Sequence, residues 1–305
     1  MDQPLSRTAR LGIIHFMLWP KTMSGEGPIV ETVERLVADT DFEAVELTRI
    51  ADAASRARVR EIAETARVAV AFGAQPILLS RKLNLNALHE SDRIAAIEAV
   101  KEAIGQAYSL GAVGCAVLSG PDPGEADRAR ATDLLVDSLK WLCDCSAQKG
   151  DMPIALETFD RVPFGKNCLI GPNAEAAEVA RRVRKDFPSF GLLIDLSHLP
   201  LQGESPQQAV SAVRDCLVHA HMGNCVMRDP THEAYGDSHP RFGVPGGEND
   251  APELAAYLRE LLAAGFLSET RRPILSFEVK PLHGESVEAL IAGSKRTLAQ
   301  AWAAV

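Results

Sequence analysis

The sequence predicts one domain over residues 1–305, an α/β fold of the single (β/α)8 TIM barrel type. Eight short apolar segments rich in β-forming residues alternate with eight amphipathic helical segments, which is typical of parallel βα units. Almost no further strand or helix is left over once these eight units are assigned. A doubly wound open sheet is the main alternative, but the sequence has neither its usual GxGxxG turn nor a Walker A motif. A closed barrel of eight βα units accounts best for the pattern.

The expected strands and helices follow one another in strict alternation. The strands are short apolar runs, at 11–16, 44–47, 68–73, 113–118, 154–158, 191–195, 217–222 and 274–279. The helices carry apolar residues three and four positions apart, at 29–38, 54–66, 92–110, 126–148, 174–186, 206–214, 252–264 and 286–303. Gly111, Gly150 and Gly265 each follow a helix, where a left-handed residue can end it before the next strand.

Charge and composition narrow the classes of function. The chain has 32 Lys+Arg and 41 Asp+Glu, a formal net charge of −9 and a pI near 5.4. Its positive charges are scattered rather than clustered, so we expect no nucleic-acid partner. The N-terminus carries no signal peptide and no stretch approaches the roughly 20 apolar residues of a membrane span, so we expect a cytoplasmic protein without a membrane partner. The six cysteines form no CxxC pair, which argues against a disulfide or zinc-ribbon framework.

Four of the expected strands end in side chains that bind metals. The C-terminal ends of barrel strands surround one pocket, where we expect Glu157, Asp195, His221 and Glu278 to converge. Carboxylates gathered there repel one another, and a divalent cation is the simplest compensation. Three carboxylates and one imidazole suit Mn²⁺ best, with Co²⁺ or Mg²⁺ as alternatives. His219 points the same way as His221 along its strand, so either could be the ligand, and His221 is preferred because it lies nearer the rim.

Two long loops follow strands and are expected at the catalytic end, at 78–91 and at about 223–250. The expected substrate contacts come from strand ends and from the second loop, and they are His15, Trp19, Glu46, His198, Arg228, His239 and Arg241. Either arginine could instead be a solvated surface residue. Glu46 could form a rim salt bridge, and Trp19 could pack at a subunit contact. His198, His232 and His239 are candidates for a catalytic base, because imidazole titrates near neutrality.

Several motifs resemble those of a known superfamily. LETFD, LIDLSH, HAHMGN and FEVKP occur in this order at the expected strand ends, and SDRIAAIEAVKEAIGQAYSLG at 91–111 resembles the third helix of the same proteins. Nearly the whole chain resembles the xylose-isomerase-like superfamily of sugar epimerases and isomerases. The resemblance implies that the metal ligands are Glu157, Asp195, His221 and Glu278. It also implies that Glu157 and Glu278 exchange the substrate proton and that His198 lies close enough to the substrate to bind it or to assist catalysis.

The loop after the seventh strand departs from the sugar epimerases. Those proteins carry an Arg six positions after the strand-seven His, whereas here Met227 takes that position and Arg228 follows. The segment GNCVMRDPTHEAYGDSHPRFGVPGGEND, at 223–250, more closely resembles the large subunit of bacterial C-glycoside deglycosidases. That resemblance implies a metal-dependent enzyme that acts on 3-oxo glycosides together with a small β subunit.

The function that we expect is that of a sugar isomerase or epimerase. A divalent metal that chelates a carbonyl and a neighbouring hydroxyl stabilises the enediolate formed when the adjacent carbon loses a proton. The first alternative is the catalytic subunit of a C-glycoside deglycosidase, a lyase in which the same enolate expels the anomeric group. Two others are a hydrolase of endonuclease-IV type, which the acidic charge disfavours, and a non-catalytic binding subunit. The expected partners are a sugar or glycoside substrate and either further copies of the chain or the small β subunit.

Overall fold

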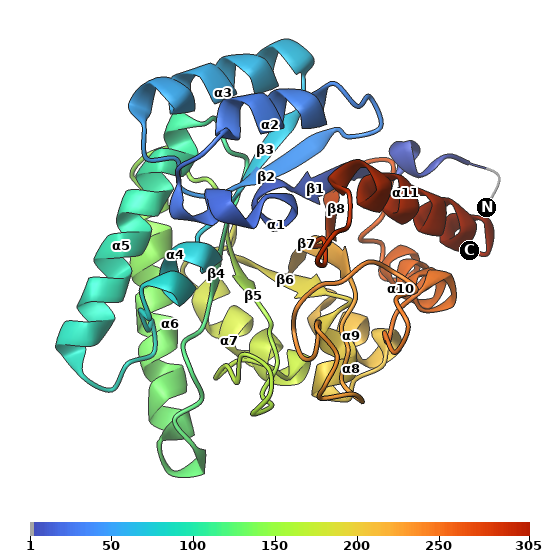
Figure 1. Ribbon diagram of the computed structural model, residues 1–305. Coiled ribbons are helices and arrows are strands. Elements are labelled where there is room, and N and C mark those ends of the chain that lie inside the picture. Colours follow the sequence, from blue (N-terminus) through green and yellow to red (C-terminus); the bar gives the residue numbers. More distant parts are fainter. Residues whose placement is uncertain (1–2) are drawn as a thin grey trace.

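Eight parallel strands close into one barrel, in which β1 pairs with both β2 and β8 (Figure 1). The computed structural model describes residues 3–305. The strands, each paired with the next, are β1 (Arg10–Ile14), β2 (Ala44–Leu47), β3 (Ala69–Gly73), β4 (Cys115–Leu118), β5 (Ile154–Glu157), β6 (Gly191–Asp195), β7 (Leu217–Gly223) and β8 (Ile274–Glu278). The predicted (β/α)8 TIM barrel is confirmed.

The helices predicted from periodicity surround the barrel (Figure 1). Side-chain caps fix several of their starts: Asp52 accepts a hydrogen bond from the Ser55 amide, and Ser205 and Gln208 form a capping box. These helices are α2 (Ile29–Val37), α3 (Ala53–Ala66), α5 (Glu90–Ser109), α6 (Glu125–Ala147), α7 (Asn173–Arg184), α9 (Pro206–Val213), α10 (Ala251–Ala263) and α11 (Val287–Ala303).

Three short helices lie at the C-terminal end of the barrel, where the sequence gives no helical period. They are α1 (His15–Leu18), α4 (Gln75–Ser80) and α8 (His198–Gln202). The 3-10 turn η2 (Pro20–Ser24) follows α1, and a second 3-10 turn, η1 (Leu5–Arg7), precedes β1. The first strand was expected to continue to residue 16, but it ends at Ile14 because α1 begins at His15. Segments of four to six residues are too short to repeat an apolar pattern.

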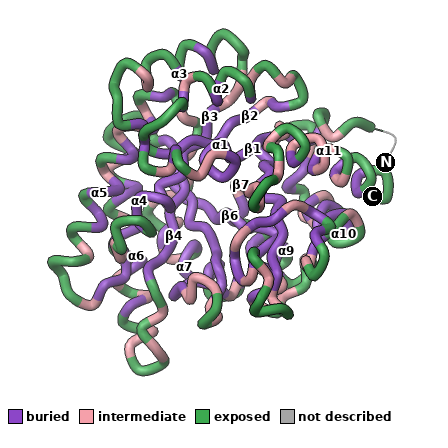
Figure 2. Tube along the Cα trace, in the orientation of Figure 1, coloured by how far each residue is buried: buried purple, intermediate pink, exposed green. Residues whose placement is uncertain are grey.

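The main hydrophobic core lies between the strands and the surrounding helices, and the strands are almost entirely buried (Figure 2). The barrel interior contains smaller clusters, of which one is formed by Ala44, Ala71 and Ile274 and another by Ala116, Ala155 and Leu193. Interiors of such barrels are usually filled by layers of Val, Ile and Leu. The small side chains here leave open space at the N-terminal end of the barrel, as the cavity described below shows.

Strand register brings the polar strand ends to one level. Asp195 is the register partner of His221, and Glu278 is the partner of Gly223. Glu157 pairs with Leu193, two residues before Asp195. In the described part of the chain, no helix is both long enough and apolar enough to span a membrane.

Candidate active site

Four ligand-type side chains meet at the C-terminal end of the barrel. One donor atom from each of Glu157, Asp195, His221 and Glu278 lies within 4.8 Å of the other three. Glu157, Asp195 and His221 are each at most 2 % exposed to solvent, and the Glu278 side chain is 12 % exposed. They lie on β5, β6, β7 and β8, so consecutive strands present them to a single point.

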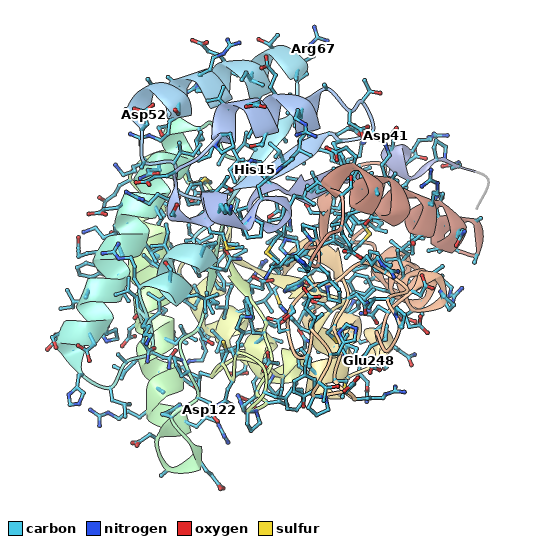
Figure 3. All side chains as sticks on the ribbon, in the orientation of Figure 1. His15, Asp41, Asp52, Arg67, Asp122 and Glu248 are labelled. Atoms are coloured by element: carbon cyan, nitrogen blue, oxygen red, sulfur yellow. The ribbon has the colours of Figure 1, made fainter. Side chains whose placement is uncertain are left out.

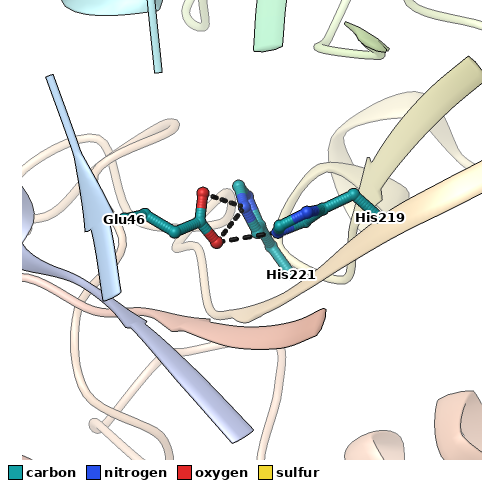
Figure 4. A group of neighbouring side chains, drawn as sticks. All are labelled: Glu46, His219 and His221. Carbon is teal, nitrogen blue, oxygen red and sulfur yellow. Dashed lines mark hydrogen bonds and ion pairs between the residues drawn. The ribbon is translucent and has the colours of Figure 1, made fainter. Parts of the chain in front are cut away.

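His221 is oriented by a carboxylate on the opposite side of its ring. Its Nε2–H donates to Glu46 Oε1 at 3.1 Å, and His219 Nε2–H donates to the same oxygen at 2.7 Å (Figure 4). His221 Nδ1 therefore faces the other carboxylates, 2.8 Å from Glu278 Oε2 and 3.4 Å from Glu157 Oε1. A carboxylate that fixes the outer nitrogen of a histidine is the usual support of a metal-binding imidazole.

The unpaired atoms of this cluster fit a divalent cation. Glu157 Oε1, His221 Nδ1 and Glu278 Oε2 are buried and, among the residues described, have no hydrogen-bond partner. Burial disfavours the charged form of His221, but Glu46 and the two other glutamates outweigh it and hold its pKa well above the ordinary value. A divalent cation at this point would offset the same negative charge. The donor set, rich in carboxylate oxygen, suits Mn²⁺, Co²⁺ or Mg²⁺.

Neighbouring side chains fix the carboxylates. Asp195 accepts hydrogen bonds from Ser197, at 2.9 Å from the amide and 2.6 Å from the hydroxyl. Gln75 on α4 donates to Glu157 Oε2 at 2.7 Å. Burial and the charge of Glu278 raise the pKa of Asp195, as expected when like charges share a dry site. Gln75 was not predicted as a site residue, because a glutamine in an unrecognised short helix gives no sequence signal.

Asp237 on the long loop gathers three cationic groups beside the metal-type cluster. It lies 2.8 Å from His239 Nε2, 3.3 Å from His198 Nε2 and 2.9 Å from Lys166 Nζ. Burial opposes its ionisation, but these neighbours outweigh burial and hold its pKa well below the ordinary value. Neither Asp237 nor Lys166 was singled out from the sequence. His198 also donates through Nδ1 to the carbonyl of Thr158 at 2.7 Å.

His239 lies between the cluster of four metal-type residues and the group of side chains around Asp237. It adopts a φ of +53°, a conformation that non-glycine residues rarely take and that is common at functional sites. Its Nδ1 lies 3.5 Å from Asp195 Oδ2, and its Nε2 lies 3.5 Å from Glu278 Oε1. Burial opposes protonation of His239, but Glu278 and Asp237 outweigh it and raise the pKa to about 9. Burial likewise opposes protonation of His198, where Asp237 raises the pKa to about 10.

The loop after β5 is shaped so that Lys166 reaches this group. Asp160 is fully buried and accepts hydrogen bonds from the amides of Val162, Lys166 and Asn167. Such a carboxylate organises a turn by satisfying successive backbone donors. This loop also contacts the long loop after β7, because the rings of Phe164 and Tyr235 stack with their centroids 5.2 Å apart.

A cavity of about 520 Å³ opens above these residues and has two chemically different sides. The polar side includes Glu157, His221, Glu278, His239 and Lys166. The apolar side is contributed by α1, η2 and α4, with Phe16, Met17, Met23, Pro76 and Leu79. Apolar pockets with a few convergent polar and titratable groups are the usual form of small-molecule sites.

The sequence matches the family described as xylose isomerase-like TIM barrels over residues 35–291. The chain belongs to this family. No curated protein matches the sequence.

Solved structures share the fold of this xylose isomerase-like barrel at low sequence identity. A D-tagatose 3-epimerase-like protein has a TM-score of 0.71 and 17 % identity, covering 96 % of this chain and 97 % of its own. An L-ribulose 3-epimerase has a TM-score of 0.70 and 17 % identity, covering 97 % and 96 %. An AP endonuclease, family 2, from Brucella melitensis has a TM-score of 0.68 and 17 % identity, covering 93 % and 97 %. These likenesses establish the fold alone.

Two of the predicted pocket residues of this xylose isomerase-like barrel lie away from the cavity. Because β1 ends at Ile14, His15 turns toward α2 and its Nε2–H donates to Thr32 Oγ1 at 2.7 Å (Figure 3 labels His15). Trp19 packs beside His15 and under Arg35. Neither His15 nor Trp19 lines the cavity, so the expectation that they wall it is corrected.

The predicted arginines and His232 also lie outside the cavity lining. Arg228 has a side chain that is 81 % exposed and pairs with Glu248, which is labelled in Figure 3. Arg241 is 44 % exposed and pairs with Glu285. His232 Nδ1 accepts a hydrogen bond from the amide of Ala234. Glu46 and His239 do line the cavity, and His198 adjoins it through Asp237.

Proposed function

We propose that the protein is a divalent-metal-dependent enzyme that removes a proton from the carbon next to a sugar carbonyl. The observation that carries this proposal is a set of buried atoms of Glu157, His221 and Glu278 that have no hydrogen-bond partner among the described residues and border one cavity. A bound cation, Mn²⁺ by preference, would polarise the carbonyl oxygen and acidify the neighbouring C–H bond. The residues that would hold it are Glu157, Asp195, His221 and Glu278.

Glu157 and Glu278 are the proposed acid and base. They lie on β5 and β8, separated by β6 and β7, so a substrate between them presents a different face to each. One carboxylate takes the proton and the other returns it, which inverts the carbon or moves the carbonyl. Gln75 holds Oε2 of Glu157 by its hydrogen bond and leaves Oε1 directed at the cluster.

The charged groups around Asp237 would stabilise negative charge on the substrate. His239 and Lys166 line the cavity, and both are held in place by Asp237. Fixed cationic donors in a site shielded from water favour an oxyanion as it develops, because little reorganisation is needed. His198 supports this group from below as a positioning residue, bonded to Thr158 and to Asp237.

Elimination from a 3-oxo glycoside is the second candidate function. The apolar side of the cavity favours it, because Phe16, Met17 and Leu79 offer contact area that a free sugar does not need. In that reaction C2 loses its proton, the bond from C1 to the aglycone breaks, and the departing aglycone takes the bonding electrons and a proton. A small β subunit is then the proposed partner, whereas an isomerase is proposed to form oligomers of this chain alone.

Deuterium exchange tests both candidates. Mn²⁺-loaded protein in D₂O is incubated with free keto-sugars and with 3-oxo glucosides, and mass spectrometry follows label and products. Label in an epimer or isomer supports the first candidate, and release of an aglycone supports the second. Glu278→Gln should abolish exchange, whereas Glu102→Gln, an exposed change on α5, should leave it intact. Absence of exchange with every substrate would contradict enolate chemistry.

A further inference from the structure

A second cavity, of about 220 Å³, opens at the N-terminal end of the barrel, opposite the candidate active site. Its walls come from the starts of the strands and include Ala71, Ala116 and Ala155. Three arginines border it, Arg10, Arg271 and Arg272, in a chain whose net charge is −9. We propose that this cavity binds a small oxyanion, such as a phosphate, sulfate or carboxylate group.

Arg10 is the central residue of the proposed site. It begins β1 and lies on the same side of the strand as Gly12 and Ile14, because strand residues alternate between faces. Ile14 borders the active-site cavity, and Arg10 borders the opposite one. No hydrogen bond or ion pair joins its guanidinium to any residue in 3–305. A half-buried arginine without a partner is unusual and leaves its forked donors free for an anion.

Arg272 provides a second, independent indication. Its Nε is buried and lacks a hydrogen-bond partner in the described chain, although its Nη2 donates to both carboxylate oxygens of Glu43. It adopts a φ of +40°, which is strained for a non-glycine residue. Strain and an unsatisfied buried donor next to one cavity are more typical of a ligand site than of a solvated rim.

The charge balance of the cavity favours an anion. Arg272 pairs with Glu43, and Glu46 accepts hydrogen bonds from His219 and His221. Arg10 and Arg271 remain without a carboxylate partner among the described residues. Arg271 donates to the carbonyl of Leu217 and lies over the ring of Phe266, so its charge stays near the cavity mouth. The volume admits a phosphate, sulfate or small carboxylate but not a nucleotide.

The two cavities share one residue. Glu46 borders both of them, and His219, which borders only the N-terminal cavity, shares its oxygen with His221 (Figure 4). Only the side chains of His219 and Glu46 would therefore separate an anion beside His219 from His221, a proposed metal ligand. Binding at one end of the barrel can in this way affect the other, and any such coupling must be equal in both directions.

Isothermal titration calorimetry tests the proposal with sodium sulfate and, separately, sodium phosphate. Metal-loaded protein is titrated at constant ionic strength, with chloride as the replaced ion. We expect saturable binding, and an increase in Kd of about tenfold for Arg10→Gln, because a charge-assisted bidentate pair is lost. Arg130→Gln on α6 removes the same charge from an exposed position and should not change Kd. Arg10→Lys, which keeps the charge but not the fork, should give an intermediate value.

Three results would overturn the proposal. The first is the absence of saturable binding up to about 20 mM anion, a range in which a specific site is easily detected. The second is equal weakening by Arg10→Gln and Arg130→Gln, which would indicate general charge attraction. The third is loss of anion binding in Glu278→Gln, which would place the anion at the metal-type cluster. The proposed enzymatic function can fail without affecting any of these results.

Discussion

Asp237 holds together three cationic side chains that come from separate parts of the chain. Replacing it with Asn keeps the shape but leaves Lys166, His198 and His239 without their common counter-charge. Because breaking a buried charge pair typically costs about 3–5 kcal/mol, we expect Asp237→Asn to lower the free energy of unfolding by about 3 kcal/mol in urea denaturation. Asp229→Asn, an exposed change on the same loop, should alter it by less than about 0.5 kcal/mol. Equal effects would show that Asp237 is not a structural counter-charge.

The strand-end residues of this site could be predicted from the sequence, whereas its loop residues could not, and the difference has a physical reason. Glu157 and Glu278 are the last residues of apolar strands, so strand alternation and barrel geometry determine where they point. Asp237 and Lys166 lie in loops, where position depends on turns, stacking and backbone strain rather than on a repeat. His239 was among the expected substrate contacts, but nothing in a lone aspartate two residues earlier indicated that its side chain would be only 1 % exposed.

His15 gives a pH dependence that can be separated from the active site. Burial lowers its pKa to about 4 from the ordinary value of 6.5. Between those values the unfolded chain takes up a proton and the folded chain does not, so stability is lost as pH falls from about 6.5 to about 4. The pKa difference corresponds to about 3 kcal/mol.

Comparing variants across pH isolates this contribution. His15→Gln should flatten the stability curve between pH 7 and pH 4.5 relative to the wild type, because glutamine does not titrate. His89→Gln, at an exposed position, should follow the wild-type curve. Urea denaturation at several pH values measures both. An unchanged slope in His15→Gln would show that this histidine is not held neutral.

At the level of elements, length decided which helices could be predicted. Helices such as α5 and α6 repeat their apolar pattern over many turns, and the sequence located them to within a few residues. In contrast, α1, α4 and α8 complete only about one turn, yet α1 and α4 supply the apolar side of the cavity and α8 carries His198. The unpredicted elements are therefore those that shape the site.

The contact between the loops after β5 and β7 depends on Gly236. It has a φ of +84°, and an added Cβ would lie 2.5 Å from the carbonyl oxygen of Phe164. Gly236→Ala should separate the two loops and weaken the Lys166 to Asp237 ion pair. Gly246→Ala is the matched control, because Gly246 has a φ of +80° on the same loop but open space around its Cβ position.

Both substitutions carry the same backbone strain, so the difference between them measures the loop contact. We expect Gly236→Ala to lose more stability than Gly246→Ala and to increase cleavage of the loop by a protease in limited proteolysis. Similar proteolysis rates in the two variants would show that the loops do not depend on each other.

Over the whole molecule, the proposed metal ligands tie together four consecutive strands. Without a cation, three carboxylates share a buried point, where His221 is close to Glu157 and Glu278 and His239 is close to Asp195. A metal that binds only the folded barrel stabilises it by about 2.7 kcal/mol at a hundredfold excess over Kd. We expect EDTA to lower the unfolding temperature by several degrees and Mn²⁺ to restore it.

This effect should involve the whole barrel, because β5 to β8 form half of a closed sheet. Circular dichroism and tryptophan fluorescence should therefore report the same transition, with and without EDTA. Asp195→Asn should remove the response to metal, since it lowers the charge of the cluster while keeping its volume. If the wild-type unfolding temperature were the same in EDTA and in Mn²⁺, these four residues would form a buried ion network and not a metal site. The clustering of three carboxylates would then have a cause other than metal binding.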